Sequence, residues 1–363
     1  MLNWRPRRQL ERRGMQLAGM IALAGILDVV AGCVLAYVAG FSAMQSVLSH
    51  PRWLWLAAMA GVLCVSFIGY CCAYRGIYRA EGGYVLPHRL LLAVVTAGFG
   101  GFFAHGGTTP DDLALQQAGA DPRDSVVRAA TLGGVEQGIL AVAGAVASAL
   151  VLCLRLTGPP PNTTLPWVII PVPATIVACW AAARFAPSLR EKGGWRGSVS
   201  MLLDSIRLAR RLFERPQRYW LALGGMVVFW AADMFAVWAG LAAFGFAMDP
   251  AALVVGFCTG MVFTRRMAPM AGAGMLTLAL SAALWYCGVP LPVAIAGTFA
   301  YRALTLWLPM PFGLAALPVL RQLGTRSMQA RDEQGRRDET EEVAGESWVD
   351  PALPAVLPVT PAA

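Results

Sequence analysis

The sequence of 363 residues is 57% hydrophobic and only 14% charged, and its mean hydropathy is +0.57. Soluble domains carry about 25% charged residues, so this composition argues against a soluble enzyme of this length and against a disordered chain. The net charge of +8 comes from basic residues between long apolar runs, as the positive-inside bias of membrane proteins requires, which argues against nucleic-acid binding.

The chain opens with a basic segment, residues 1–16, which contains five arginines and is predicted to be cytoplasmic. Six apolar runs follow that are long enough to predict transmembrane helices across a core of about 30 Å. The first is too long for the core of an ordinary signal peptide, so we interpret it as a helix that stays in the protein. The runs are Leu17–Gly40, Trp53–Tyr74, Ser125–Leu156, Trp167–Phe185, Tyr219–Phe244 and a last run from Leu291 through Trp307.

A further apolar stretch, Leu90–Gly107 with its continuation to Ala118, lies between the second and third runs. The segment Arg184–Arg218 contains nine basic residues, so it should be cytoplasmic, as should the N-terminus. Four spans between these two segments satisfy both conditions, whereas a fifth crossing would place the nine basic residues outside. We therefore predict a re-entrant hairpin that enters from the cytoplasm and turns near His105–Pro110.

The segment between the two halves, about residues 198–214, predicts an amphipathic linker helix with apolar residues at the three-four spacing and arginines on the other side. Such a helix suits the inner-leaflet interface and anionic lipids. A plain linker helix packed on protein is an equally good interpretation.

A second ambiguous stretch is Ala251–Tyr286. Its first part, Ala251–Thr264, has 14 residues, which make about 21 Å of helix against a core of about 30 Å. It then meets Arg265, Arg266 and the glycine- and proline-containing segment Pro269–Gly274. We therefore predict a second re-entrant hairpin, which enters from outside and has these residues at its tip.

Together the elements predict an all-α polytopic membrane protein with about six transmembrane helices plus two re-entrant hairpins in an inverted repeat. Repeat one covers about residues 53–156 and repeat two about residues 219–320, within a membrane domain at residues 17–320. Each hairpin ends in a glycine-led corner with proline, an arrangement of broken helices that is typical of transporters. Coincidence, in a chain with 24 prolines, is the alternative. Residues 321–363 are polar and then rich in proline and alanine, and predict a disordered tail.

Several charged residues fall inside the predicted membrane runs, where each must face a cavity or a partner. The neighbouring guanidinium groups of Arg265 and Arg266, beside a Gly/Pro loop, suit a phosphate group. Arg302 and Glu136 follow the two hairpins at comparable positions, so either they pair or Arg302 faces the substrate. For Asp28 and Asp233, which also lie in apolar runs, a packing carboxylate is as good an interpretation as a functional one.

The first hairpin adds polar candidates near its predicted tip. An N-cap of the short returning helix is an equally good interpretation of its two adjacent acids. The candidate substrate-binding residues are therefore Arg265, Arg266, Arg302, Glu136, His105, Thr108, Thr109, Asp111 and Asp112.

The eight cysteines nearly all lie inside apolar runs, and the sequence has only three histidines. No spacing among them resembles a zinc site, and buried thiols behave as small hydrophobic groups. We therefore expect no disulfide framework, no metal site and no cofactor.

Several short motifs resemble the flippase-like transmembrane domain family, the family of the lysylphosphatidylglycerol synthase membrane region. In the second half these are Pro269–Gly274, the corner Gly288-Val289-Pro290, and Tyr301-Arg302 followed by Trp307-Leu308-Pro309 and Gly313. In the first half Pro110, the run Leu115–Gly119, Arg128-Ala129 and Glu136 are similar to the first-repeat pattern. The resemblance covers about residues 15–320.

The resemblance implies movement of a lipid between leaflets, with an anionic phospholipid or a lipid-linked substrate as partner. The 43 residues after Leu320 are too few and too polar for a soluble synthase domain, so we expect no enzymatic activity. A secondary transporter of a small anion or amphiphile is one alternative, since the same arginines would serve it. A membrane-embedded lipid-linked glycosyltransferase with Asp111 and Asp112 as its acidic site is another. Their predicted cytoplasmic position argues against the glycosyltransferase, since enzymes that use polyprenyl donors usually act outside.

The expected location is the bacterial cytoplasmic (inner) membrane, with multiple passes and both termini in the cytoplasm. The sequence is also compatible with a homo-oligomer, and it predicts no nucleic-acid partner.

Overall fold

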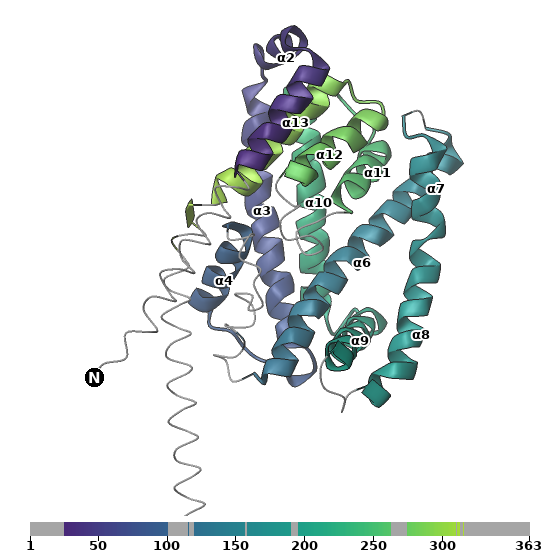
Figure 1. The fold of residues 1–363 in the computed structure, drawn as a ribbon. Helices are drawn as coiled ribbons and strands as arrows, with labels where there is room; N and C mark the ends of the chain where they lie inside the picture. The colour runs from purple at the N-terminus through teal and green to yellow at the C-terminus, as the bar shows by residue number, and fades with distance from the viewer. Residues whose placement is uncertain are drawn as a thin grey trace, which may run out of the picture.

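The computed structural model describes residues 25–100, 115, 120–156, 158–189, 195–262, 274–309, 311–312 and 315. Over these residues all regular structure is helical, which confirms the predicted all-α class (Figure 1). The elements are a first helix Gly25–Ala39, α2 (Phe41–Leu48), α3 (Trp53–Tyr78), the 3-10 turn η1 (Ala80–Gly82), α4 (His88–Gly100), α6 (Pro122–Leu154), α7 (Pro161–Ile169), α8 (Pro171–Leu189), α9 (Trp195–Glu214), α10 (Trp220–Ala243), α11 (Pro250–Met261), α12 (Gly274–Tyr286), α13 (Leu291–Arg302) and the π turn η2 (Ala303–Trp307).

Four of the described helical segments are long and apolar enough to cross a membrane: α3, α6, the consecutive helices α7 and α8, and α10. A fifth exists if the first helix and α2 are one span, although the two are bent by 105° at Gly40, whose φ is +86°. The apolar helices predicted for a membrane protein are therefore present. The count of six spans and the inverted repeat stay predictions.

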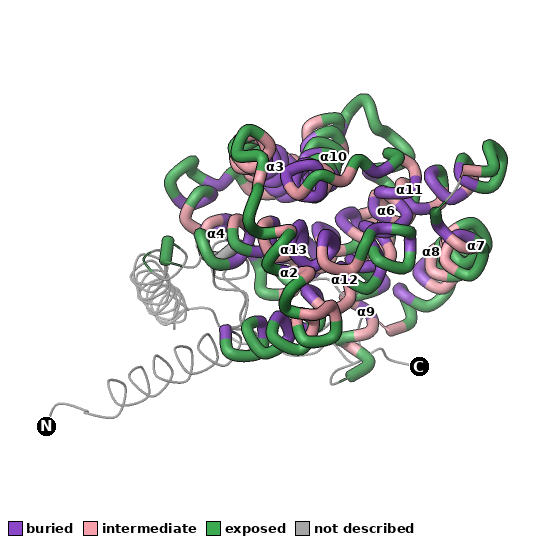
Figure 2. The backbone as a smooth tube through the Cα atoms, turned by 90° about the horizontal axis from the view of Figure 1, so that it is seen from above, coloured by how far each residue is buried: buried purple, intermediate pink, exposed green. Residues whose placement is uncertain are grey.

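Helices α3 and α10 run antiparallel and form the most extensive helix pair among the described residues. The amide of Arg52, just before α3, donates 2.8 Å to the carbonyl of Ala243 at the end of α10. Glycines let the two backbones approach, because a Cβ on Gly69 would lie only 2.8 Å from the carbonyl oxygen of Gly225. Of the most apolar part of α10, 72% is buried, against 6% for α7 and α8, and Figure 2 shows α10 largely buried and α7 and α8 at one end of the molecule.

Helices α11 and α12 form a short hairpin in place of two full spans. They contain 12 and 13 residues, so each is about 20 Å long or less, short of a core of about 30 Å. They pack closely, because a Cβ on Gly260 would lie 2.7 Å from Cα of Leu280. The base of the hairpin lies at the end of the molecule that carries α2 and the start of α7 (Figure 1), where Asn162 donates a hydrogen bond to Tyr286.

Helix α9 lies across the opposite end of the molecule. Figure 1 shows it almost along its axis, whereas α3, α10 and α8 run up the page. Its position and its bounds agree with the amphipathic helix predicted at residues 198–214. Helix α4 occupies this half as well, but the predicted turn near His105–Pro110, the basic segment 1–16 and the tail 321–363 lie outside the described residues.

The two corners predicted from glycine and proline each begin a helix. Asp121 caps α6 by accepting 3.2 Å from the amide of Arg123, and Pro122 is the first residue of that helix. Gly288 has a φ of +97°, which favours glycine, and α13 begins at Leu291 just beyond Pro290. The second corner directs α13 back through the molecule beside α10 and the first helix.

Candidate functional site

Two buried carboxylates and five side chains around them form a polar cluster in the described interior. We name this set the carboxylate cluster: Asp28, Ser66, Asp233, Thr277, Tyr301, Arg302 and Trp307. All are buried except Trp307, which is 39% exposed. The members come from the first helix, α3, α10, α12, α13 and η2, so the fold brings together parts of the chain that are far apart in sequence.

The Asp233 half of the cluster lies at the centre of the α3–α10 pair. Ser66 donates 2.7 Å to Oδ1 of Asp233, and the Tyr301 hydroxyl donates 2.8 Å to Oδ2. Ser66 lies near the midpoint of the 26-residue α3, and Asp233 lies near the midpoint of the 24-residue α10. In a helix that crosses a bilayer, these positions are close to the midplane.

The Asp28 half lies between the first helix, α12 and α13. Thr277 donates 2.5 Å to Oδ1 of Asp28, and the indole nitrogen of Trp307 donates 3.1 Å to Oδ2. Arg302 Nη2 lies 3.9 Å from Oδ1, which is an ion pair without a hydrogen bond. Helix α12 begins against this point, because a Cβ on Gly274 would lie 2.8 Å from the carbonyl oxygen of Leu27.

Tyr301 and Arg302 connect the two halves, since they are consecutive residues at the end of α13 and each contacts a different carboxylate. The helix then widens into η2, where the amide of Leu308 donates 2.9 Å to the carbonyl of Ala303, five residues earlier. A π turn inside a helix is frequent at functional sites. Here it lies between Arg302 and Trp307, which contact the same carboxylate from either side of the turn.

The energetic cost of these groups explains why they are clustered. A charged carboxylate at the centre of a bilayer costs about 3 kcal/mol on insertion scales, so it must face a cavity or a partner. Each of the two accepts hydrogen bonds on both of its oxygens from within the cluster. Both carboxylates are therefore satisfied by neighbouring side chains, in surroundings that are otherwise apolar.

The structure describes only two of the predicted site residues, Arg302 and Glu136. Arg302 lies in the cluster, and its partner Asp28 was not among the predicted partners. Glu136 is 2% exposed on α6, and its backbone carbonyl accepts 2.9 Å from the indole of Trp230. The candidates that lie outside the described residues are Arg265, Arg266, His105, Thr108, Thr109, Asp111 and Asp112.

The side chains that sequence reasoning missed are neutral hydrogen-bond donors. Ser66 and Thr277 are single hydroxyls inside apolar runs, and such residues are common in membrane helices. Tyr301 and Trp307 belong to the motif that resembles the flippase-like family, but their contacts with Asp233 and Asp28 are not visible in that motif.

A second polar set holds the helices together at the α9 end. Arg128 is 6% exposed and donates from Nη1 to the carbonyls of Ile77, Tyr78 and Ala80, at 3.3, 3.1 and 2.9 Å. Arg128, a residue of α6, thus satisfies carbonyl groups at and just beyond the end of α3. Its Nε donates a hydrogen bond of 2.7 Å to Asp124.

Glu81, just beyond the end of α3, completes this set. It accepts a hydrogen bond from the Tyr219 hydroxyl, and its other oxygen lies 3.6 Å from Arg211 of α9. The bond from Tyr219, with Arg211, Arg218 and Arg215 nearby, holds the pKa of Glu81 below its usual value. The same bond raises the pKa of Tyr219. These contacts join the end of α3 to the start of α10 and to α9.

Among the described residues, no group of three or more His, Cys, Asp or Glu side chains is arranged to hold a metal ion. Comparisons of the chain with known protein families, with curated proteins and with solved structures found no match. The cluster itself therefore carries the functional argument.

Proposed function

We propose that this protein is an integral membrane protein that moves a lipid with an anionic headgroup between the leaflets. The observation that carries the proposal is the carboxylate cluster, which holds two carboxylates and a guanidinium between apolar helices. Ionisable residues at membrane depth mark substrate or ion pathways more often than they stabilise a fold. The resemblance of Tyr301-Arg302 and Trp307 to the flippase-like family supports the same function.

In this proposal, the cluster divides the path of the headgroup into two halves. The α11–α12 hairpin enters from one face, and α12 begins next to Asp28. Arg265 and Arg266 precede α12 in the chain and are proposed to receive the phosphate from that face. The hairpin predicted at Leu90–Ala118 would provide the entrance from the other face, with His105, Thr108 and Thr109. The acyl chains would stay in the bilayer, so no wide pore is needed.

The order of elements supports the proposed inverted repeat. Among the described residues, each unit has a long helix, α3 or α10, then short apolar helices, α4 in the first unit and α11 and α12 in the second, and then a proline corner that begins a further helix. Transporters built in this way bind substrate near the midplane, where the two units meet. Asp233 and Ser66 lie on the two central helices at that depth. Movement of one unit against the other would expose the cluster to each side in turn.

The proposal is tested with purified protein in liposomes that contain a headgroup-labelled phosphatidylglycerol, with dithionite as the quencher of the outer leaflet. We expect wild type to bleach label from both leaflets. Liposomes with the Arg265→Gln/Arg266→Gln double variant or with Asp233→Asn should lose only about half of the label, as empty liposomes do. Arg155→Gln is the control, because Arg155 is exposed at the end of α6.

Equal rates for wild type, both variants and empty liposomes, across anionic and lipid-linked-sugar substrates, would refute the flippase proposal. Uptake of a soluble anion by the same liposomes would instead favour the alternative of a small-anion transporter.

A further inference from the structure

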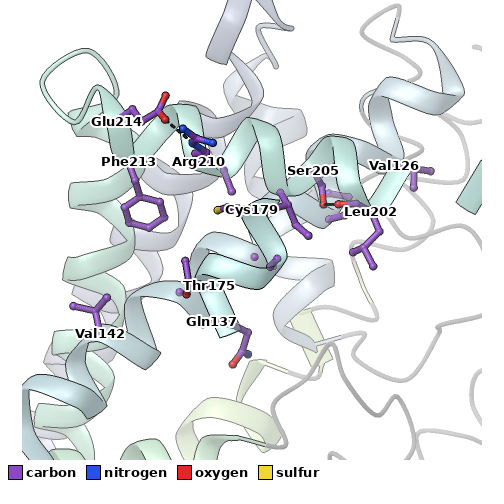
Figure 3. A pocket seen from close by; sticks show the side chains of 18 residues that line it. Val126, Gln137, Val142, Thr175, Cys179, Leu202, Ser205, Arg210, Phe213 and Glu214 are labelled. Carbon is purple, nitrogen blue, oxygen red and sulfur yellow. Dashed lines mark hydrogen bonds and ion pairs between the residues drawn. The ribbon is translucent and has the colours of Figure 1, made fainter. Parts of the chain in front are cut away.

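A pocket of about 940 Å³ lies between α6, α8 and α9, away from the carboxylate cluster (Figure 3). We name it the α6–α9 groove. Its walls include Gly134 and Gly138 of α6, Thr175 and Cys179 of α8, and Phe213 of α9. The volume is within the range of about 300–1,000 Å³ that is usual for ligand pockets.

The groove exists because α6 presents mainly glycine and alanine on this face. A Cβ added at Gly134 would meet no atom within 4 Å, and one at Gly138 would lie 3.7 Å from the Phe213 ring. Helix α8 packs mainly against α9 and only weakly against α6, so nothing in the described chain fills the space between them.

The mouth of the groove is apolar and exposed. Val142, Leu202 and Phe213 are 60%, 56% and 44% exposed, and they come from α6 and α9. Around a helix bundle of this composition, such a mouth faces lipid. An empty apolar gap loses dispersion contacts on all of its walls, whereas a flexible hydrocarbon chain restores them. The walls therefore fit an acyl chain.

The charged rim of the groove indicates which lipid fits. Arg210 Nε lies 2.6 Å from Oε1 of Glu214, and Figure 3 shows this pair beside Phe213 and Cys179. Both side chains are about half exposed, so the ion pair is weak and Arg210 can exchange its partner. A phosphodiester is a strong acceptor for a guanidinium group, and α9 lies across the molecule where a headgroup layer would be.

We propose that the α6–α9 groove binds one acyl chain of an anionic phospholipid, whose phosphate contacts Arg210. The bound lipid fills the gap between α8 and the rest of the molecule and holds α8 in place. The groove shares no residue with the carboxylate cluster, so this site does not depend on the proposed transport.

The site is tested with the full chain in phosphatidylcholine vesicles that contain a minor fraction of phosphatidylglycerol with a diazirine on one acyl chain. After irradiation, mass spectrometry should place most cross-links in the peptides of α6, α8 and α9 that line the groove. In Gly134→Trp the indole would occupy part of the groove and displace the acyl chain, so the yield of these cross-links should fall at least about tenfold. Displacement of only two methylene groups from the groove would already lower the affinity by about that factor. Gly61→Trp is the matched control, because Gly61 also has open space beside it but lies on α3.

The headgroup is tested with the same diazirine chain on phosphatidylcholine. Wild type should favour the phosphatidylglycerol probe, and Arg210→Gln should remove that preference, whereas Arg207→Gln, one turn away, should keep it. Cross-links spread evenly over the exposed faces of α3 and α8, or unchanged by Gly134→Trp, would overturn the proposal. So would a thiol-specific cross-link between two copies of a variant that retains only Cys179, with no lipid product, because it would assign the groove to a second copy.

Discussion

Arg302 and Asp28 form a buried ion pair in which Nη2 and Oδ1 are 3.9 Å apart. The hydrogen bonds to the carboxylate come from Thr277 and Trp307, so the guanidinium group balances its charge without holding it directly. The position of Asp28 is thus fixed by neutral donors, while Arg302 provides the nearest positive charge. A change at Arg302 should therefore affect charge more than geometry.

Replacement of Arg302 by Gln should lower the free energy of unfolding by about 3–5 kcal/mol, because it leaves the carboxylate of Asp28 buried without its nearest charge. The Arg302→Gln/Asp28→Asn double variant should recover part of this loss. Reversible unfolding in mixed detergent micelles measures both. Arg210→Gln is the control, since its pair with Glu214 is exposed and worth at most about 1 kcal/mol. Strictly additive losses in the double variant would show that the two residues do not interact.

Gly69→Ala should destabilise the protein by about 1–3 kcal/mol, because the new Cβ would lie 2.8 Å from backbone atoms of α10 and the two central helices would have to separate. Gly61→Ala on the same helix meets no atom within 4 Å, and there alanine should be neutral or stabilising by up to about 1 kcal/mol. Unfolding of the two variants under one condition provides the comparison. Similar effects at both positions would contradict the close contact of α3 with α10.

The contacts of Glu81 predict a loss of stability in acid. Its pKa is lowered in the folded protein, mainly by the hydrogen bond from Tyr219 and then by Arg211. A group of this kind contributes stability above its unfolded pKa, and the contribution disappears as the pH falls through the folded pKa. The melting temperature of wild type should therefore exceed that of Glu81→Gln at pH 6.5. The difference should shrink from about pH 5 downward and vanish below the lowered pKa, which lies under 4.5.

Tyr219→Phe provides the control for this pH dependence, because it removes the largest cause of the lowered pKa. In that background, the effect of Glu81→Gln should be smaller. A difference between wild type and Glu81→Gln that is constant from pH 6.5 to the acid limit would contradict the assignment.

The predicted orientation is tested with single cysteines in a background that lacks the native eight. His50 and Ser198 are both exposed, and they lie near opposite ends of the molecule, before α3 and in α9. With the basic α9 end in the cytoplasm, an impermeant thiol reagent should label His50→Cys in intact cells and Ser198→Cys only after lysis. The opposite pattern would show the inverted orientation. Labelling of both cysteines in intact cells would show that the two positions are not on opposite sides of the membrane.

Much of the fold follows from the sequence because long apolar runs determine the long helices. The predicted run Tyr219–Phe244 corresponds to α10, and the glycine-proline corners correspond to the starts of α6 and α13. The shortness of α11 and α12 was also predictable, because Ala251–Thr264 cannot cross a bilayer core. Length and composition alone carry that information.

The contacts of the site could not be predicted in the same way, because they depend on which faces of distant helices meet. Periodicity does not show that Asp28 lies beside Thr277 and Arg302, or that Ser66 meets Asp233. From the sequence, we expected Arg302 to pair with Glu136 or to face the substrate. A partner on the first helix was not among these expectations. The run Trp167–Phe185 was predicted as one continuous helix, but α7 ends at Ile169 and α8 begins at Pro171. Pro171 and Pro173 are the signal in the sequence for this interruption, which the apolar run alone does not show.

The contacts of Asp28 have a consequence for the biogenesis of the protein. Asp28 is synthesised about 250 residues before Thr277 and Arg302. At elongation rates of about 5–20 residues per second, on the order of 10–50 s pass between the synthesis of Asp28 and that of its partners. During this interval the carboxylate must remain near the aqueous surface or be sheltered by the insertion machinery. Truncation before α12 would therefore leave Asp28 without the hydrogen bond from Thr277 and without the charge of Arg302.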